Sequence, residues 1–126
     1  MFSHVMVGSD DLAASRKFYD AVLGTLAIPA GITDEKGRIF YLSPTGVFAI
    51  TSPLNGAPAS AANGGTIGFN VGDPATVDAW HAAGVANGGV SCEEPPGVRE
   101  GGMGKMYLAY LRDPFGNKLC ALHRMG

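Results

Sequence analysis

An internal repeat constrains the fold of this chain more than any other feature of its sequence. When the sequence is aligned with itself so that His4 lies over Thr66, one pattern occurs twice: an alternating strand, an acidic helix start, an aromatic pair and a glycine-rich helix end. The offset is close to half of the 126 residues. We therefore expect one domain built from two copies of one unit, at about residues 1–52 and 65–126, with a linker at 53–64.

Each unit is expected to begin with a strand followed by a helix. Apolar and polar residues alternate over about residues 2–8 and 65–71, which is the pattern of a half-buried strand. The next segments, 9–24 and 72–89, begin with short polar residues that can cap a helix and end at glycine. The apolar positions that should cover a sheet are Leu12, Phe18, Tyr19, Val22 and Leu23 in the first helix and Val77, Trp80 and Val85 in the second.

The rest of each unit consists of strands and turns. Residues 38–51 and 105–122 both have the pattern of an apolar hairpin with Pro and Gly in the turn. Residues 93–104 contain two prolines and four glycines, so we expect a long mobile loop of the kind that often borders a site. Glycine makes up 19 of the 126 residues, which fits many strands joined by tight turns. The predicted fold class is α+β.

The composition argues against several classes of partner. The chain has 9 Lys and Arg against 11 Asp and Glu, a net charge of −2 and no basic cluster, so we expect no binding to nucleic acid or to an anionic membrane. No apolar run has the length of a spanning helix, and the first residues lack the basic start of a signal peptide. The two cysteines form no CxxC pair, and without an export signal they favour the reducing cytoplasm.

Three motifs, in their order and spacing, resemble one known superfamily. They are Phe2-Ser3-His4-Val5, the helix end Phe18-Tyr19-Asp20-Ala21-Val22-Leu23-Gly24, and the turn Leu111-Arg112-Asp113-Pro114-Phe115-Gly116-Asn117-Lys118. Together with two βαβββ units, they resemble the vicinal oxygen chelate superfamily over essentially the whole chain. That group contains the glyoxalase, bleomycin-resistance, fosfomycin-resistance and extradiol-dioxygenase proteins. The resemblance implies curved mixed sheets around a cup that holds the active site, helices on the outer face, and a homodimer.

The resemblance also implies where a metal site would lie. The family takes one ligand, usually His or Glu, from the first strand and one from the last strand of each unit. The matching residues here are His4 and Thr66 on the first strands and Ala49 and Cys120 on the last strands. Only His4 fits the pattern. Because a catalytic divalent metal needs about three protein ligands, we expect neither a metal nor another cofactor.

The candidate catalytic residues are His4, Tyr110 and Cys120. His4 is expected to transfer a proton and Tyr110 to polarise an oxygen, while Cys120 acts as a nucleophile with His4 as its base or is a small apolar core residue. The expected pocket residues are Met6, Phe40, Ala49, Thr66, Leu108 and Arg99. Simpler roles stay open. His4 can be a polar residue whose hydrogen bonds are satisfied inside the cup, and the aromatic residues can only fill the cup. Arg99 can be a solvated cation beside Glu100.

Three functions stay open. The expected pocket is largely apolar with a few polar groups, which suits a small, partly hydrophobic organic molecule as ligand. The protein then acts on that molecule by metal-independent lyase or isomerase chemistry, or sequesters it without chemistry, as the likeness to bleomycin-resistance proteins implies. Strict glyoxalase I activity is not expected, because the family's carboxylates are absent from the matching positions. The third alternative is a dimerisation module that has kept the fold and lost the site.

Overall fold

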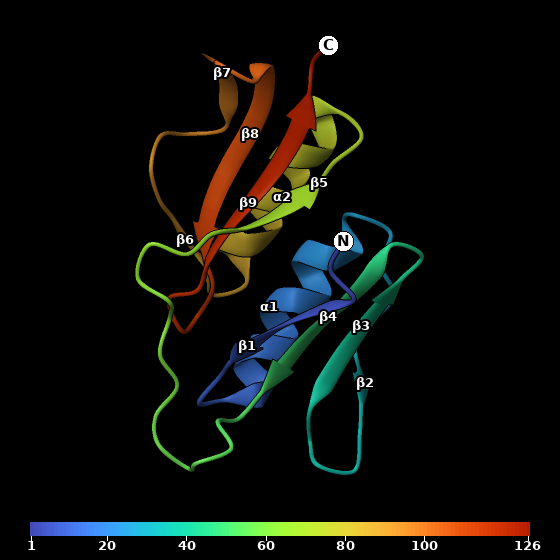
Figure 1. The fold of residues 1–126 in the computed structure, drawn as a ribbon, viewed down its shortest axis with the longest axis vertical. Helices are drawn as coiled ribbons and strands as arrows, with labels where there is room; N and C mark the ends of the chain where they lie inside the picture. Colours follow the sequence, from blue (N-terminus) through green and yellow to red (C-terminus); the bar gives the residue numbers. More distant parts are fainter.

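The computed structural model describes residues 1–126, and its two halves have a similar order of elements, with one additional strand in the second half. The first half contains β1 (His4–Gly8), α1 (Leu12–Gly24), β2 (Ile32–Thr33), β3 (Ile39–Ser43) and β4 (Gly46–Thr51). The second contains β5 (Ile67–Asn70), α2 (Pro74–Ala86), β6 (Val90–Ser91), β7 (Gly97–Gly101), β8 (Gly104–Arg112) and β9 (Lys118–Arg124). The halves lie one above the other along the long axis of the molecule (Figure 1). The predicted α+β class with a repeated βαβββ order is confirmed.

Each half has its own mixed sheet. The first has the order β1-β4-β3-β2, in which β1 is parallel to β4 and the other pairs are antiparallel. The second has the order β5-β9-β8-β6, in which β5 is parallel to β9, and β7 also pairs with β8. The four strands of the first sheet have counterparts in the five-stranded second sheet, where β6 and β7 both pair with β8 as β2 alone pairs with β3. The first strand of each half, β1 or β5, therefore lies at the edge of its sheet.

Both helices begin where the sequence predicts. The carboxylate of Asp11 accepts the backbone N–H three residues later at 3.1 Å and caps α1. Asp73 makes the same contact at 2.7 Å and caps α2, with Pro74 in the first turn. The first helix ends at Gly24 as expected, and the second ends at Ala86, just before its expected glycine. Neither helix combines the length and the apolar character needed to span a bilayer.

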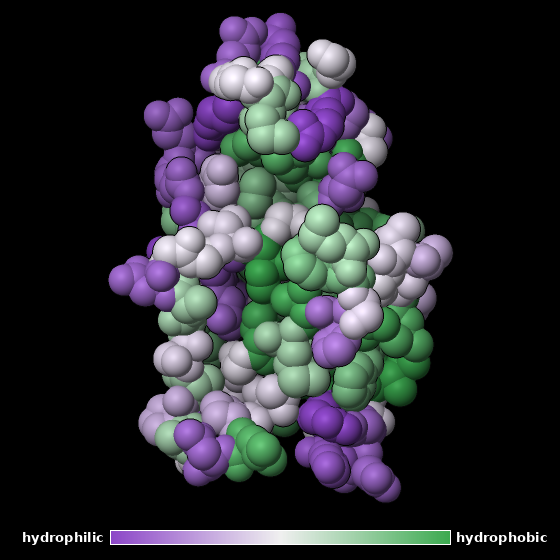
Figure 2. All heavy atoms as spheres, in the orientation of Figure 1, coloured by the Kyte–Doolittle hydropathy of each residue, from purple (hydrophilic) through white to green (hydrophobic).

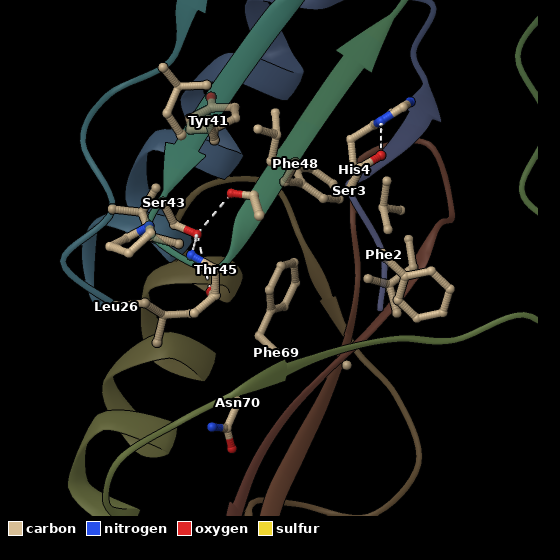
Figure 3. Close-up of a pocket in the computed structure, with 18 of the residues that line it drawn as sticks. Phe2, Ser3, His4, Leu26, Tyr41, Ser43, Thr45, Phe48, Phe69 and Asn70 are labelled. Carbon is tan, nitrogen blue, oxygen red and sulfur yellow. Dashed lines mark hydrogen bonds between the residues drawn. The ribbon is translucent and has the colours of Figure 1, made fainter.

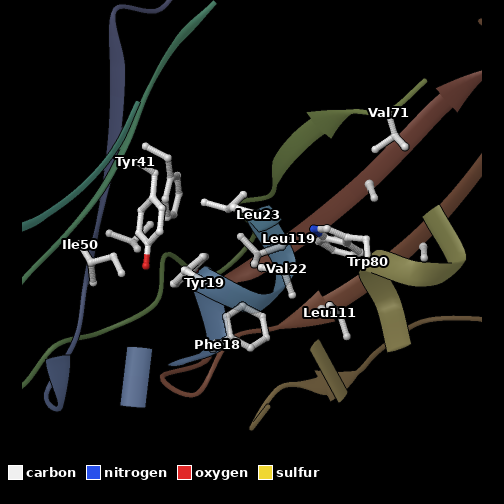
Figure 4. Close-up of a cluster of buried hydrophobic side chains, with 14 of the residues drawn as sticks. Phe18, Tyr19, Val22, Leu23, Tyr41, Ile50, Val71, Trp80, Leu111 and Leu119 are labelled. Atoms are coloured by element: carbon white, nitrogen blue, oxygen red, sulfur yellow. The ribbon is translucent and has the colours of Figure 1, made fainter. Parts of the chain in front are cut away.

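One continuous apolar core joins the two halves (Figure 4). Phe18, Tyr19, Val22 and Leu23 of α1 are fully buried in it, together with residues of both sheets such as Tyr41, Ile50, Leu111 and Leu119. The two helices also pack against each other. Each helix covers one face of its own sheet. The opposite face of each sheet carries no helix, and we call it the open face.

Two local expectations differ from the structure. Residues 97–101 form β7 and pair with β8, so the expected mobile loop 93–104 is in part a hairpin that turns at Gly101–Gly104. The three residues Val98-Arg99-Glu100, with glycine on either side, pair with Tyr107, Met106 and Lys105 of β8. Val85 is 50% exposed, and the buried residue on that turn is Gly84, because Val77, Trp80 and Gly84 share one face of α2.

Candidate functional site

A groove of about 520 Å³ lies between the two halves (Figure 3). One wall comes from β3, β4 and the turn between them, and the facing wall comes from β5. Its aromatic residues are Phe2, Tyr41, Phe48 and Phe69, and its polar residues include Ser43, Thr45 and Asn70. Phe48 and Phe69 contact each other edge to face, with ring centroids 5.6 Å apart. The groove is therefore a largely apolar site with a few polar groups.

The segment after α1 closes one end of this groove. The backbone N–H groups of Leu26 and Ile28 both donate to the carbonyl of Leu23, at 3.0 and 3.1 Å. Between them, Ala27 has a φ of 62°, a left-handed conformation that few residues other than glycine adopt. This tight turn sends the apolar side chains of Leu26 and Ile28 toward the core and the groove. The end of a helix thus supplies part of the wall.

His4 lies at the edge of the groove (Figure 3). Its Nδ1 is 2.7 Å from the hydroxyl of Ser3, and both residues are exposed. The imidazole is therefore accessible both to solvent and to a molecule in the groove. Among the residues that the sequence predicts for the site, His4 is the one that lines this groove.

The remaining predicted residues lie on the two open faces, in matching places. In the first sheet, Ala49 pairs with Met6 on one side and with Phe40 on the other. In the second sheet, Cys120 pairs with Gly68 and with Tyr110. Position by position, Cys120 is therefore the counterpart of Ala49 and Tyr110 the counterpart of Phe40.

Tyr110 and Cys120 form a neutral polar pair on the second open face. Burial raises the pKa of the Cys120 thiol to about 11, although its hydrogen bond with Tyr110 acts in the opposite direction. Burial and the neighbouring thiol also raise the pKa of the Tyr110 phenol. Both groups are protonated at neutral pH. The pair can donate hydrogen bonds to a ligand, and it supplies neither a thiolate nor a phenolate.

Two cations flank this pair. The Lys118 ammonium lies 5.0 Å from the centre of the Tyr110 ring and forms an ion pair with Glu93. Arg99 of β7 donates to the carbonyl of Pro95 at 2.8 Å and lies 3.9 Å from the carboxylate of Glu94. Both cations act on the Cys120 thiol, where they favour its ionised form. Leu108, which is 3% exposed, completes the predicted residues on this strand.

A model of the Glyoxalase/Bleomycin resistance protein/Dioxygenase superfamily matches residues 1–121. The chain belongs to this superfamily. Among solved structures, it is similar to a glyoxalase/bleomycin resistance protein from Albidiferax ferrireducens T118, at 63% identity and a TM-score of 0.96, over 98% of this chain and 99% of that one. No curated protein matches it.

Two more distant structures share the fold of this superfamily member. A glyoxalase-related enzyme from Fulvimarina pelagi is 22% identical, with a TM-score of 0.76, over 98% of this chain and 88% of that one. A lactoylglutathione lyase from Agrobacterium tumefaciens is also 22% identical, with a TM-score of 0.67, over 98% of this chain and 92% of that one.

The residues of this superfamily member do not fit the divalent-metal site that the resemblance implies. Ala49 occupies one ligand position and has no donor atom, and Thr66 offers a neutral hydroxyl, which is a poor ligand for such ions. Nowhere in the chain do three His, Cys, Asp or Glu side chains come together in a way that could hold a metal. We therefore assign no chemical step to a metal.

The predicted residues lie in separate groups and do not line one common cavity of the chain. Met6, Phe40 and Ala49 share the first open face, whereas Leu108, Tyr110, Cys120 and Arg99 belong to the second sheet. Met6 and Thr66 line a smaller cavity of about 290 Å³ near the ends of β1 and β5.

Sequence reasoning missed most of the groove's lining. Tyr41, Phe48 and Phe69 stand at alternating positions that face the helices, so the pattern alone assigns them to the core. In the structure these three residues also line the groove, where the two sheets face each other. Their place there depends on contacts between the halves, which alternation within one strand does not give.

Proposed function

We propose that this superfamily member binds a small, partly hydrophobic organic molecule without the divalent metal of its relatives. The observation that carries the proposal is the 520 Å³ groove, whose size falls in the range of small-molecule sites, with aromatic walls and few polar groups. Figure 2 supports it, since apolar side chains gather in the middle of this face of the molecule and hydrophilic ones at its two ends.

The first experiment is elemental analysis of the purified protein, before and after incubation with zinc, nickel, manganese and iron(II). We expect less than about 0.1 metal ion per chain after dialysis, because two of the four family positions hold Ala49 and Thr66. Tight binding of one ion per chain would overturn the metal-free part of the proposal.

A thermal-shift screen of small organic molecules then tests the groove itself. We expect ligands that raise Tm in the wild type to lose this effect in Thr45→Trp, because Thr45 is exposed on the groove wall and an indole there fills the space. Ala82→Trp is the matched control, since Ala82 is exposed on α2 outside the groove. Ligands that stabilise both variants equally would place binding elsewhere.

Binding without chemistry is the first form of this proposal. Sequestration needs only a cavity, and the polar pair Tyr110–Cys120 is neutral at neutral pH. The second form is metal-independent proton transfer of the lyase or isomerase type. It is favoured by one observation, namely that His4 is kept at the family position and borders the groove. Turnover that survives exhaustive chelation and disappears in His4→Ala selects the second form; binding with no turnover selects the first.

We further propose that the protein is a homodimer in the cytoplasm. The strands β1 and β5 each have one unpaired edge, and Ile32, Leu42 and Met6 leave large apolar surfaces exposed, 58%, 49% and 38% respectively. The partner we propose is a second copy of the chain, whose second sheet would place its open face against the open face of the first sheet of this copy. Sedimentation velocity tests this: a dimer that Leu42→Arg converts to monomer is expected, and a wild-type monomer at micromolar concentration excludes it. The free thiols of Cys92 and Cys120 agree with a reducing compartment.

A further inference from the structure

The 290 Å³ cavity offers a ligand one cation and several neutral hydrogen-bond donors. It lies where β1, the residues before β5 and the start of β9 meet, and no Asp or Glu lines it. Lys118 is its one charged residue, and the hydroxyls of Ser60 and Thr66 are its further free donors. Met6 adds an apolar wall. A cavity with one cation, neutral donors and an apolar side matches a small organic anion better than a neutral or cationic molecule.

Lys118 already holds a carboxylate, and that carboxylate comes from a loop. The ammonium pairs with Glu93 across the face of the Tyr110 ring. The Lys118 side chain is 23% exposed, whereas that of Glu93 is 46% exposed. The Glu93 backbone has a φ of 57°, one of two left-handed conformations at residues other than glycine. Such a conformation is unfavourable for glutamate, so the ion pair holds Glu93 in a place that its backbone does not prefer.

The same arrangement occurs at the neighbouring cation. Arg99 lies 3.9 Å from Glu94, the residue next to Glu93, and both cations act on the Cys120 thiol. One short loop thus supplies a carboxylate to each of the two cations on this face. Since the Lys118 side chain has four rotatable bonds, release from Glu93 frees its ammonium to turn toward the cavity that its stem lines.

We infer that Lys118 binds the carboxylate of a small organic acid in this cavity and that the Glu93 carboxylate competes for the Lys118 ammonium in the ligand-free protein. The inference rests on the proposed small-molecule function and names its ligand class: a carboxylate with a small apolar body. The ammonium pairs with the carboxylate of the ligand, Thr66 donates to it, and the apolar body contacts Met6.

The test compares benzoate with benzamide, which has nearly the same shape and no charge. Dissociation constants come from chemical-shift titrations of the 15N-labelled full chain. We expect benzoate to bind about fivefold more tightly than benzamide, as a half-exposed ion pair allows. Lys118→Met should abolish this preference. Glu93→Gln should strengthen benzoate binding severalfold and leave benzamide unchanged, because it removes the internal competitor. Lys105→Met, at an exposed lysine outside the cavity, is the matched control.

The outcomes separate this inference from the proposed function. Equal binding of benzoate and benzamide, or a benzoate affinity that neither substitution changes, overturns the role of Lys118 while small-molecule binding still stands. Failure of benzoate, phenylacetate and propionate to bind the wild type also overturns it, even if neutral ligands bind in the groove. A loss of benzoate binding in Lys118→Met would also follow from a loss of folding. The Glu93→Gln variant is expected to bind benzoate more tightly, and an unfolded protein would not show this increase in affinity.

Discussion

The phenol of Tyr19 donates a hydrogen bond to Oδ2 of Asp113 at 2.5 Å, and this buried contact joins α1 of the first half to the turn between β8 and β9 of the second. Asp113 also accepts the backbone N–H groups of Phe115 and Asn117, at 2.8 and 3.0 Å. Asn117 in turn donates to the carbonyl of Gly8 at 3.3 Å. The turn motif therefore connects the two halves as well as two strands.

Replacing Tyr19 with phenylalanine should destabilise the protein by about 1–3 kcal/mol, because it removes a hydrogen bond from a carboxylate that is only 3% exposed. Urea unfolding monitored by the fluorescence of Trp80, the one tryptophan and fully buried, measures the change. Tyr107→Phe is the control, since its hydrogen bond to Asp78 lies at an exposed site, and should cost less than about 0.5 kcal/mol. Equal losses in both variants would contradict the role of the buried pair.

Stability should fall as pH rises above about 9. Burial raises the pKa of Cys120 from 9.0 to about 11 and raises the pKa values of Tyr19 and Tyr41 above 10.0. A group whose pKa is higher in the folded chain stabilises the fold fully below its unfolded pKa and loses this effect as pH rises toward the folded value. The urea midpoint should therefore be flat from pH 7 to 8.5 and then decrease. A midpoint that rises toward pH 10.5 would show that the sign is wrong.

The Cys120 thiol should be nearly inert toward iodoacetamide at pH 7, because it is 5% exposed and its pKa is about 11. Cys92 is partly exposed and should be alkylated first. Peptide mass spectrometry of the native protein over pH 7 to 9.5 measures both rates, and the rate at Cys120 should increase roughly tenfold per pH unit. Rapid alkylation of Cys120 at pH 7 would restore it as a candidate nucleophile.

Glycine at position 89 should be required for close packing of α2 on the rest of the core. A Cβ there would lie 2.9 Å from the carbonyl oxygen of Gly84 and 3.2 Å from that of Arg112, and backbone atoms cannot move aside easily. Gly89→Ala should cost about 1–3 kcal/mol of unfolding free energy. Gly24→Ala is the matched control, because nothing lies within 4 Å of a Cβ at that position. Urea unfolding of both variants checks the contrast.

Local signals made much of the fold predictable. Asp11 and Asp73 cap their helices because a short side chain before an apolar stripe satisfies free N–H groups, and this depends on neighbours in sequence only. The equivalence of Ala49 and Cys120 followed from the family resemblance, and the matching registers of the two sheets agree with it. Strand β7 was missed because its pairing depends on β8 rather than on its own glycine-rich sequence.

The candidate site was less predictable than the fold. The groove beside His4 depends on how far the two sheets diverge, which no local pattern in the sequence specifies. Alternation assigns each side chain to a face of its own sheet. The pairing of Tyr110 with Cys120 depends on the register of β8 with β9. Alternation cannot give the angle between the two sheets. Phe48 and Phe69 face the helices by alternation, and they also form part of the wall of the 520 Å³ groove.

The matching registers of the two sheets have a consequence for how proteins of this architecture change over time. Ala49 and Cys120 each lie within a complete strand ladder, so the backbone around them is held by main-chain hydrogen bonds whatever side chain they carry. Side chains at such positions can be exchanged one at a time while the ladder stays intact. An ancestral chemistry can be lost, and a different one acquired, within a scaffold whose folding does not depend on either.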